Sequence, residues 1–434
     1  MRTIIRFVVT SLGLYPLSVW FRESCFVSAG RAMTCRFHYK KQLERIRAKP
    51  RDKKIRVLFI VSEIAKWKEQ KVYEQMDKSG VFEPYVGLSA WNTQGGLSPD
   101  ELNATHARAE KFFDKLGDRH VRTVRVEKGK KIIVDLREFD ADVVYYTEPW
   151  SPCKGQTPWE VSKFALTFFT PYYVPNYGFL HQECHLPVQR YSYGYFCLGD
   201  AWKSLFEKSL RYVSHVCQFI PTGHPALDYF ACDARQQLDG GLIIYAPHFS
   251  FYNANKPGYK QLYSTFDWNH NEILQYAKSH REFQWVFKPH PLLREWTQSS
   301  GLMTRQELDD YYNEWAKVGI VCTDGDYQKL FLDARVMITD CGSFLSEFGS
   351  MGKPVIHLKS KRNPRTPIAL TKVLYDTYYQ VHDLDDMYAM FKLVIEERRD
   401  PKRAERLEAA GKVGLFGVNA SENIVNYLKE ILCR

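Results

Sequence analysis

Several features that would assign this sequence to a protein class at once are missing. Its 434 residues contain no Walker or GxGxxG nucleotide-binding fingerprint, no internal repeat and no low-complexity segment. The ten cysteines are scattered and lack the spacing of a disulfide framework, which is typical of a reducing compartment. With 45% hydrophobic residues the chain can build large cores, and its length predicts two or three domains.

Metal-binding patterns are also sparse. Residues 181–185 (His-Gln-Glu-Cys-His) hold three possible zinc ligands, but no second cluster supplies a fourth ligand at a suitable spacing. No carboxylate cluster of the kind that binds Mg²⁺ occurs. We therefore predict no metal site and no cofactor.

Net positive charge is small outside one segment. Residues 31–56 contain eleven Lys and Arg and two acidic residues, so they carry nine of the ten net positive charges. The rest of the chain is almost neutral, which excludes a globally basic nucleic-acid-binding protein.

Hydrophobic runs long enough to span a bilayer are missing as well. The apolar segment 7–21 is shorter than the roughly 20 residues that a spanning helix needs, and Pro16 interrupts it. It is either a signal peptide with a cleavage site near residues 27–29, a segment that packs on the protein, or an interfacial segment. In the last case the basic residues that follow would supply a second membrane signal.

Short apolar strands alternate with helices along the chain, which predicts an α/β protein with mostly parallel sheets. The principal predicted strands are residues 55–61, 82–88, 142–146, 216–220, 242–246, 283–287, 336–339 and 355–358. The principal predicted helices are residues 63–79, 99–116, 200–211, 344–351, 384–399 and 421–432. The polar segment 233–241 is the expected linker. The predicted division is an arm (1–54), a first domain (55–232), a second domain (242–400) and C-terminal helices (401–434).

Residues 336–358 are the most informative stretch. A strand, the turn from Asp340 to Ser343, a helix and a second strand make one unit of a parallel sheet. The turn lies at the carboxyl end of a strand, where open α/β sheets bind ligands. Amides at a helix start attract phosphate, and Gly342 allows close approach to the backbone. The simpler alternatives are that Ser343 only caps the helix and that Asp340 only forms the turn.

Two further strand ends carry cationic or titratable side chains. One apolar strand ends at Lys288, and His290 lies between two prolines that hold it in a rigid turn. Another strand ends in a proline followed by His248. A single histidine is usually structural. Here, however, three strand ends in one half of the chain carry His248, Lys288 with His290, and Ser343. This convergence predicts a nucleotide or phosphate site.

The motifs around these residues resemble the CDP-glycerol glycerophosphotransferase family, bacterial enzymes of teichoic acid and related capsule synthesis. They read Tyr245-Ala-Pro-His-Phe-Ser250, Phe287-Lys-Pro-His-Pro-Leu292 and Ile338-Thr-Asp-Cys-Gly-Ser343. The likeness covers roughly residues 55–358. It implies a GT-B-like fold, in which two Rossmann-like domains face a central cleft and the second domain holds the nucleotide donor.

The resemblance implies transfer of glycerol phosphate, or a related polyol phosphate, from a CDP-activated donor to an acceptor hydroxyl, with release of CMP. Family members use one histidine from each domain, and His290 matches that of the second. The family's Trp-His-Gly segment is absent here, so His181, with His185 behind it, is the expected catalytic substitute in the first domain. The expected donor and phosphate ligands are His248, Lys288, Gly342, Ser343, Glu347 at a ribose hydroxyl, and His224. For Glu347 an ordinary helix-face acid, and for His224 a structural role, remain alternatives.

Two other functions fit the same sequence. One is a GT-B glycosyltransferase that uses a nucleotide sugar, and the other is a non-catalytic membrane-associated scaffold of a capsule assembly complex. The expected partners are a nucleotide-activated donor and a membrane-linked or polymeric acceptor, with no nucleic acid. A role in polymer synthesis favours the interfacial interpretation of residues 7–21. It predicts a peripheral location on the cytoplasmic face of the membrane, at an anionic surface.

Overall fold

The computed structural model of the chain describes residues 26–90, 97–150, 152–174, 186–230, 241–259, 261–323, 327–363, 367–415 and 419–433. Two compact units are present. The first comprises Met1–Tyr172, Phe179–Pro225 and Asn419–Arg434, and the second comprises Tyr173–Gly178 and Ala226–Val418. Nearly all of the predicted linker lies outside the described ranges.

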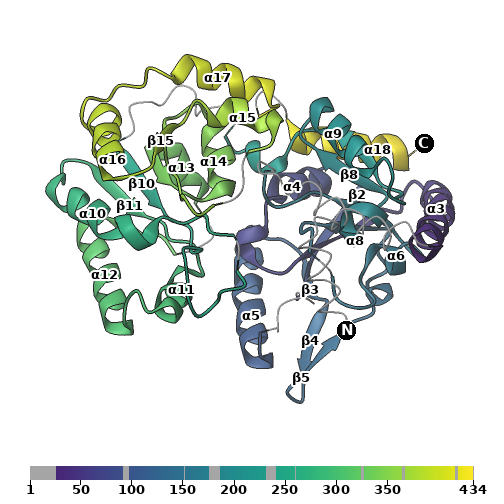
Figure 1. Cartoon of the computed structure of the whole chain (residues 1–434). Helices are drawn as coiled ribbons and strands as arrows, with labels where there is room; N and C mark the ends of the chain where they lie inside the picture. Colours follow the sequence, from purple (N-terminus) through teal and green to yellow (C-terminus); the bar gives the residue numbers. More distant parts are fainter. Residues whose placement is uncertain are drawn as a thin grey trace. The chain divides into compact units, whose positions relative to one another are not determined.

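In the described part of the first unit, seven parallel strands form a sheet in the order β3-β2-β1-β6-β7-β8-β9. Strands β2, β3 and β8 of this sheet are labelled in Figure 1. The strands are β1 (Ile55–Val61), β2 (Phe82–Leu88), β3 (His120–Arg122), β6 (Val143–Tyr146), β7 (Leu166–Phe169), β8 (Gly194–Cys197) and β9 (Gln218–Pro221). The helices are α3 (Phe26–Arg47), α4 (Gln70–Lys78), α5 (Pro99–Leu116), α6 (Pro158–Val161), α8 (Pro187–Tyr191), α9 (Asp200–Leu210) and α18 (Ala420–Leu432). An antiparallel hairpin and two 3₁₀ turns complete the unit: β4 (Val124–Glu127), β5 (Lys130–Ile133), η1 (Ile64–Lys66) and η2 (Leu136–Phe139).

The second unit repeats this design with six described parallel strands in the order β12-β11-β10-β13-β14-β15. These are β10 (Leu242–Ala246), β11 (Gln284–Phe287), β12 (Ile320–Val321), β13 (Ala334–Thr339), β14 (Val355–Leu358) and β15 (Tyr379–Val381). The helices are α10 (Phe266–Ser279), α11 (Leu293–Ser300), α12 (Arg305–Val318), α13 (Gln328–Asp333), α14 (Gly342–Gly349), α15 (Ala369–Tyr375), α16 (Leu384–Phe391) and α17 (Arg403–Lys412). A 3₁₀ turn, Pro225–Leu227, precedes the unit's sheet, and a π-helical turn, Lys392–Glu396, follows α16.

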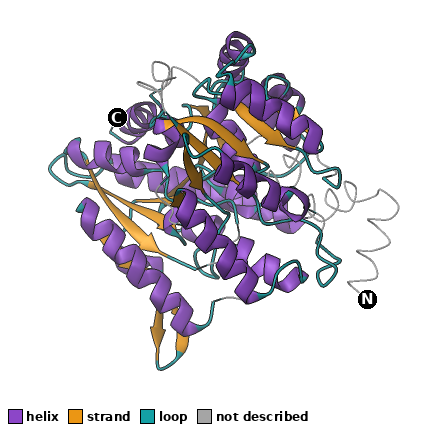
Figure 2. Cartoon of the chain, turned by 90° about the vertical axis from the view of Figure 1, so that its left-hand side faces the viewer, coloured by secondary structure: helices purple, strands orange, loops and turns teal. Residues whose placement is uncertain are grey.

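Burial explains why these strands are continuous apolar runs. Every residue of β10, β13 and β14 is buried, as expected for parallel strands whose two faces are both covered by helices (Figure 2). In the second unit, Ile243 and Ile338 share one core with Ile273 of α10 and Trp315 of α12. In the first unit, Leu428 of α18 is part of the core around β1, so the last helix packs against this unit's sheet.

The predicted α/β class with parallel sheets is confirmed. Local capping explains why α5 matches its prediction: Ser98 and Glu101 form a capping box, and Gly117 ends the helix in the left-handed conformation. The helix predicted over residues 63–79 is wrong in its first half, because α4 begins only at Gln70. The intervening Trp67 turns inward, packing its ring on Phe59 and donating its Nε1–H to Gln70.

No helix within the described ranges has the length and apolar character needed to cross a bilayer. The apolar segment 7–21 lies outside those ranges.

Candidate functional site

The order of strands in the second unit places a ligand site between β10 and β13. The chain runs outward from β10 through β11 to β12 and then returns to β13 on the other side. At this switch point the loops after the two strands diverge and leave a crevice. The segments that follow β11, β10 and β13 contain the predicted Lys288 and His290, His248, and Gly342 with Ser343. The fold thus gathers six of the eight predicted site residues, Glu347 included, in one unit.

Asp340, at the end of β13, links the segments at this edge of the sheet by hydrogen bonds. Its buried carboxylate accepts a hydrogen bond from the backbone N–H of His248, at 2.6 Å from Oδ1. Its Oδ2 accepts the N–H and the hydroxyl of Thr265, at 2.7 and 2.9 Å. Burial raises the pKa of Asp340 to about 6, although these hydrogen bonds favour the charged form. The prediction of a local turn former is therefore too narrow, because Asp340 ties the loop after β10 and the start of α10 to β13.

His248 and His290 form a pair of rings. Their centroids are 4.8 Å apart, and His290 also lies 4.6 Å from the ring of Phe249. The backbone N–H of His290 donates to the carbonyl of Pro247 at 3.0 Å, which joins the two loops. His290 is half-buried, with its ring against those of His248 and Phe249.

Burial keeps both rings neutral. It lowers the pKa of His290 to about 3, with a smaller contribution from the charge of Lys288. It also lowers the pKa of His248 well below the ordinary histidine value, and His290 adds to this effect. Neutral rings at physiological pH carry one proton each, so the position of that proton decides what they can do.

Backbone amides fix that position. The N–H of Leu292 donates to His290 Nδ1 at 3.1 Å, and the N–H of Ser250 donates to His248 Nδ1 at 3.2 Å. Each Nδ1 is therefore an acceptor, and in the neutral ring Nε2 carries the proton. The two Nε2–H groups lie at the same edge of the sheet and can donate hydrogen bonds to the oxygens of a phosphate. A nitrogen that already carries a proton cannot accept one from a hydroxyl.

Lys288 and Glu347 lie on the β11 side of this edge. The Lys288 side chain is buried, and its ammonium lies 4.9 Å from the ring centroid of Tyr327 and 5.7 Å from that of Phe344. The hydroxyl of Tyr327 donates to Glu347 Oε2 at 2.5 Å, and Glu347 is itself buried. Aromatic rings beside a buried cation and a buried carboxylate form an environment suited to a nucleoside next to a phosphate.

Helix α14 begins at Gly342, directly after the switch-point strand. Its N-cap is Cys341, whose side chain makes no capping hydrogen bond, so the interpretation of Ser343 as the cap is wrong. The half-buried Ser343 hydroxyl lies 3.5 Å from Cys341 Sγ. Ser343 thus presents a hydroxyl in the first turn of a helix, where amides lack intrahelical acceptors.

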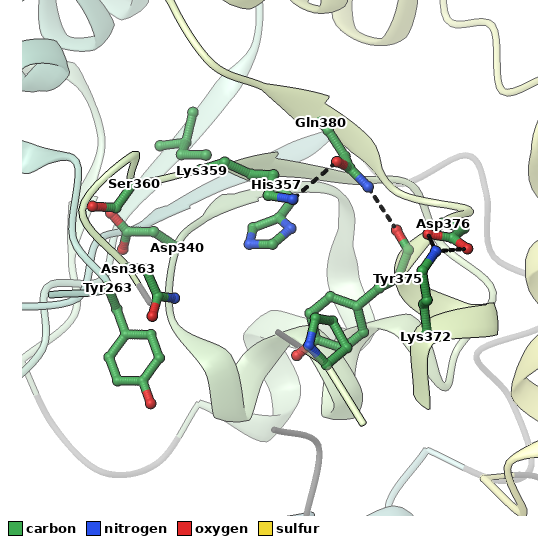
Figure 3. A pocket seen from close by; sticks show the side chains of 12 residues that line it. Tyr263, Asp340, His357, Lys359, Ser360, Asn363, Lys372, Tyr375, Asp376 and Gln380 are labelled. Atoms are coloured by element: carbon green, nitrogen blue, oxygen red, sulfur yellow. Dashed lines mark hydrogen bonds and ion pairs between the residues drawn. The ribbon is translucent and has the colours of Figure 1, made fainter. Parts of the chain in front are cut away.

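A pocket of about 380 Å³ lies between the carboxyl ends of β13 and β14 on one side and α15 with Gln380 of β15 on the other (Figure 3). It is lined by Tyr263, Asp340, His357, Leu358, Lys359, Ser360, Asn363, Pro367, Lys372, Tyr375, Asp376 and Gln380. Tyr263 connects the pocket with the histidine pair, because its ring centroid lies 5.3 Å from that of His248. The pocket and the pair therefore adjoin.

The sequence prediction missed this pocket. Lys359 and Ser360 directly follow an apolar strand, so the same strand-end argument that found Lys288 would have found them. His357 gave no such signal, because it lies inside a strand. Burial lowers the pKa of its ring to about 3, with Lys359 adding to the effect, and its Nδ1 has no partner among the described residues.

Two predicted residues are not brought to this edge by the described structure. His224 belongs to the first unit, where it is buried and its Nε2–H donates to the carbonyl of Pro171 at 2.6 Å. His181 and the 181–185 cluster lie outside the described ranges. Within those ranges, no group of three or more His, Cys, Asp or Glu is placed to hold a metal ion.

Comparisons with known proteins identify the fold. No family model matches the sequence, and no curated protein is similar to it in sequence. UDP-GlcNAc 2-epimerase from Neisseria meningitidis, bound to UDP-GlcNAc, superposes with a TM-score of 0.53 at 13% identity, over 87% of this chain and 100% of that one. A variant of the wall teichoic acid polymerase TagF gives 0.51 at 13% identity, over 95% and 97%. A second TagF variant, soaked with CDPG, gives 0.51 at 11%, over 95% and 98%. The chain has a GT-B-like fold.

Proposed function

We propose that this protein is a transferase of cell-surface polymer synthesis, which moves a polyol phosphate such as glycerol phosphate from a CDP-activated donor to an acceptor hydroxyl and releases CMP. The observation that carries the proposal is the pair of Nε2–H donors, His248 and His290, beside Lys288 at the switch point of the second unit. The fold shared with TagF, and the sequence motifs at these residues, support it.

The chemistry required is attack by the acceptor oxygen on the β-phosphorus of the donor. The bond from that phosphorus to the bridging oxygen breaks, CMP leaves with the bond's electrons, and the acceptor hydroxyl loses its proton. Such reactions depend mainly on positioning and on stabilising charge on the phosphoryl oxygens. Lys288 supplies a charge, His248 and His290 supply Nε2–H donors, and Ser343 supplies a hydroxyl at a helix start. We assign His290 to donation toward the phosphates, and we propose His181, the first-domain catalytic residue expected from the sequence, as the group that accepts the proton.

The glycosyltransferase alternative has support of its own. The epimerase neighbour is bound to UDP-GlcNAc and matches the fold as well as TagF does. The same donor edge would then hold a UDP- or CDP-linked sugar, and the reacting centre would be carbon instead of phosphorus. The leaving nucleotide separates the two functions, because a sugar transferase releases UDP or CDP from a diphosphate donor.

We also propose a peripheral location at an anionic membrane, with a membrane-linked or polymeric acceptor. Met33 and Phe37, one helical turn apart on α3, are 71% and 69% exposed. Lys40 and Lys41 follow Phe37 on the same exposed side of the helix. Large apolar side chains flanked by lysines are typical of helices that lie in a membrane interface.

Nucleotide binding tests the proposed function. Calorimetry with CDP-glycerol, CMP, UDP and UDP-glucose should show preference for the cytidine compounds. His290→Ala and Ser343→Ala should each weaken their binding about tenfold or more, because each removes a hydrogen bond to a charged group. His280→Ala, at the far end of α10 from the site, is the matched control and should bind normally.

The outcomes separate the candidates. Preference for UDP compounds would favour the glycosyltransferase, and unchanged binding in His290→Ala would refute the proposed site. Absence of binding to every nucleotide would leave a non-catalytic scaffold.

A further inference from the structure

The pocket beyond Asp340 is chemically unlike the β11 side of the site. On the β11 side, Lys288 lies among the aromatic rings of Tyr327 and Phe344. The pocket instead gathers polar side chains from the opposite half of the sheet. In Figure 3, Tyr263 and Asn363 face Gln380, Lys372 and Tyr375 across an open centre.

A nucleotide-activated donor has the same asymmetry. Its phosphates separate a nucleoside from the group to be transferred. If the phosphates bind at His248, His290 and Ser343, the nucleoside and the transferred group extend to opposite sides of the switch point. The aromatic β11 side suits the nucleoside, so the polar pocket is left for the transferred group.

We infer that this pocket binds the transferred group of the donor, and that this group is a polyhydroxylated chain or ring of five or six carbons, larger than glycerol. The inference rests on the proposed function and adds the size and class of the group. It applies equally to a pentitol phosphate and to a hexose.

Volume is the first argument for this size. The pocket measures about 380 Å³. At roughly 30 Å³ for each water-sized group, it holds on the order of ten such groups. This is the size of a pentitol or a hexose and about twice that of glycerol.

The hydrogen-bonding groups are the second argument. The Lys359 ammonium donates to Gln380 Oε1 at 3.2 Å, and the Gln380 amide donates to the carbonyl of Tyr375 at 3.4 Å. Lys372 is neutralised by Asp376 at 2.6 Å. Ammonium, amide, carboxylate and hydroxyl groups on one wall can both donate to and accept from several ligand hydroxyls.

His357 is the third argument. It is 5% exposed, lines the pocket, and has an Nδ1 without a partner in the described part of the chain. A buried unpaired nitrogen is unfavourable, and few such groups occur in native proteins. A ligand hydroxyl in the pocket, after a small rotation of the ring, would supply the missing partner.

The test compares CMP, UDP, CDP-glycerol, CDP-ribitol and UDP-glucose, together with free ribitol 5-phosphate, on the full chain. We expect CDP-ribitol to bind at least about tenfold more tightly than CDP-glycerol or, if the protein prefers uridine nucleotides, UDP-glucose to bind at least about tenfold more tightly than UDP. Gln380→Ala removes a polar contact, and Ser360→Leu occupies space in the pocket. Each should abolish the tighter binding of the larger donor and leave CMP and UDP binding unchanged. Ser279→Leu is the control, because Ser279 lies at the end of α10 that is far from the pocket.

Each outcome decides a separate point. If CDP-ribitol binds no more tightly than CDP-glycerol, and UDP-glucose no more tightly than UDP, the inference is overturned, while nucleotide binding still supports the proposed function. Variants that weaken CMP or UDP as much as the donors would assign the pocket to the nucleoside and overturn it too. Ribitol phosphate binding that Gln380→Ala abolishes, without nucleotide binding, would support the pocket and refute the proposed function. No binding of any probe would overturn both.

Discussion

At the scale of single residues, the candidate site depends on where protons and hydrogen bonds are fixed. His290 was predicted from its position between two prolines at the end of a strand. Its tautomer was not predictable, because the amide that sets it, the N–H of Leu292, becomes a donor to Nδ1 only in the folded turn. The same holds for Asp340, whose partners His248 and Thr265 lie far away in the sequence.

Asp340→Asn should lower the free energy of unfolding by about 1–3 kcal/mol, because an amide cannot accept all three hydrogen bonds that the carboxylate accepts. The effect should also depend on pH. The folded protein raises the pKa of Asp340 to about 6, so it retains a proton that the unfolded chain releases near pH 4. This group therefore stabilises the fold most at low pH, and its contribution falls, by up to about 3 kcal/mol, as the pH rises from 4 to 6.

Urea denaturation of both proteins at several pH values measures this difference. Other titrating groups cancel when the variant is subtracted from the wild type. A difference that does not change between pH 4 and pH 6 would show that Asp340 titrates normally.

His290→Gln should change acid stability in the opposite direction. Burial lowers the pKa of His290 to about 3. Below about pH 6.5 this histidine therefore binds a proton in the unfolded chain but stays neutral in the folded protein. The wild type therefore loses stability as the pH falls from 6.5 toward 3, and the variant should lose less. Thermal unfolding at pH 7 and pH 4 checks this, with His280→Gln as the control. A larger acid loss in the variant than in the wild type would contradict it.

At the scale of elements, capping and apolar patterning made most helices and strands predictable. Strands β2 and β14 and helix α5 have the predicted bounds. Elements set by tertiary contacts were missed. Residues 64–69 do not join α4 because Trp67 packs into the core, and β7 is absent from the predicted strands.

Helix α3 allows a test at this scale. Its inner face, with Tyr39 and Ile46, belongs to the core of the first unit, while Met33 and Phe37 are exposed. Lys40→Gln with Lys41→Gln should lower partitioning to phosphatidylserine-containing vesicles about 30-fold at low salt, given about 1 kcal/mol for each basic residue. Met33→Gln with Phe37→Gln should weaken binding to the same vesicles further and independently of salt.

Vesicle co-sedimentation of the full chain measures both effects. Lys130→Gln with Lys131→Gln on the β4–β5 hairpin is the matched control, since this hairpin also exposes apolar residues, Ile132 and Ile133. Binding that only the hairpin variant weakens would move the membrane surface to the hairpin, and unchanged binding in all variants would assign it to residues outside α3.

At the scale of the whole molecule, the α/β class was predictable because alternation of strands and helices is a property of the entire sequence. The order of the strands was not predictable, because an apolar run in the sequence does not show which other strands it pairs with. The switch point between β10 and β13, which makes His248 and Asp340 adjacent, follows only from that order. The chain also crosses between units at its end: α17 belongs to the second unit, whereas α18 belongs to the first.

This return of the chain predicts that a change in α18 will destabilise the first unit and spare the second. Leu428 is fully buried among residues of the first unit's core. Leu428→Ala should cost that unit about 2–5 kcal/mol, because it leaves a cavity beside β1 and α4. Hydrogen exchange read by mass spectrometry should show lost protection in β1, α4 and α18, with β10 and β13 unchanged. Lys429→Ala, on the outer side of the same helix, should alter neither. Equal loss in both sheets would mean that the two units unfold as one, and that the last helix stabilises the entire molecule.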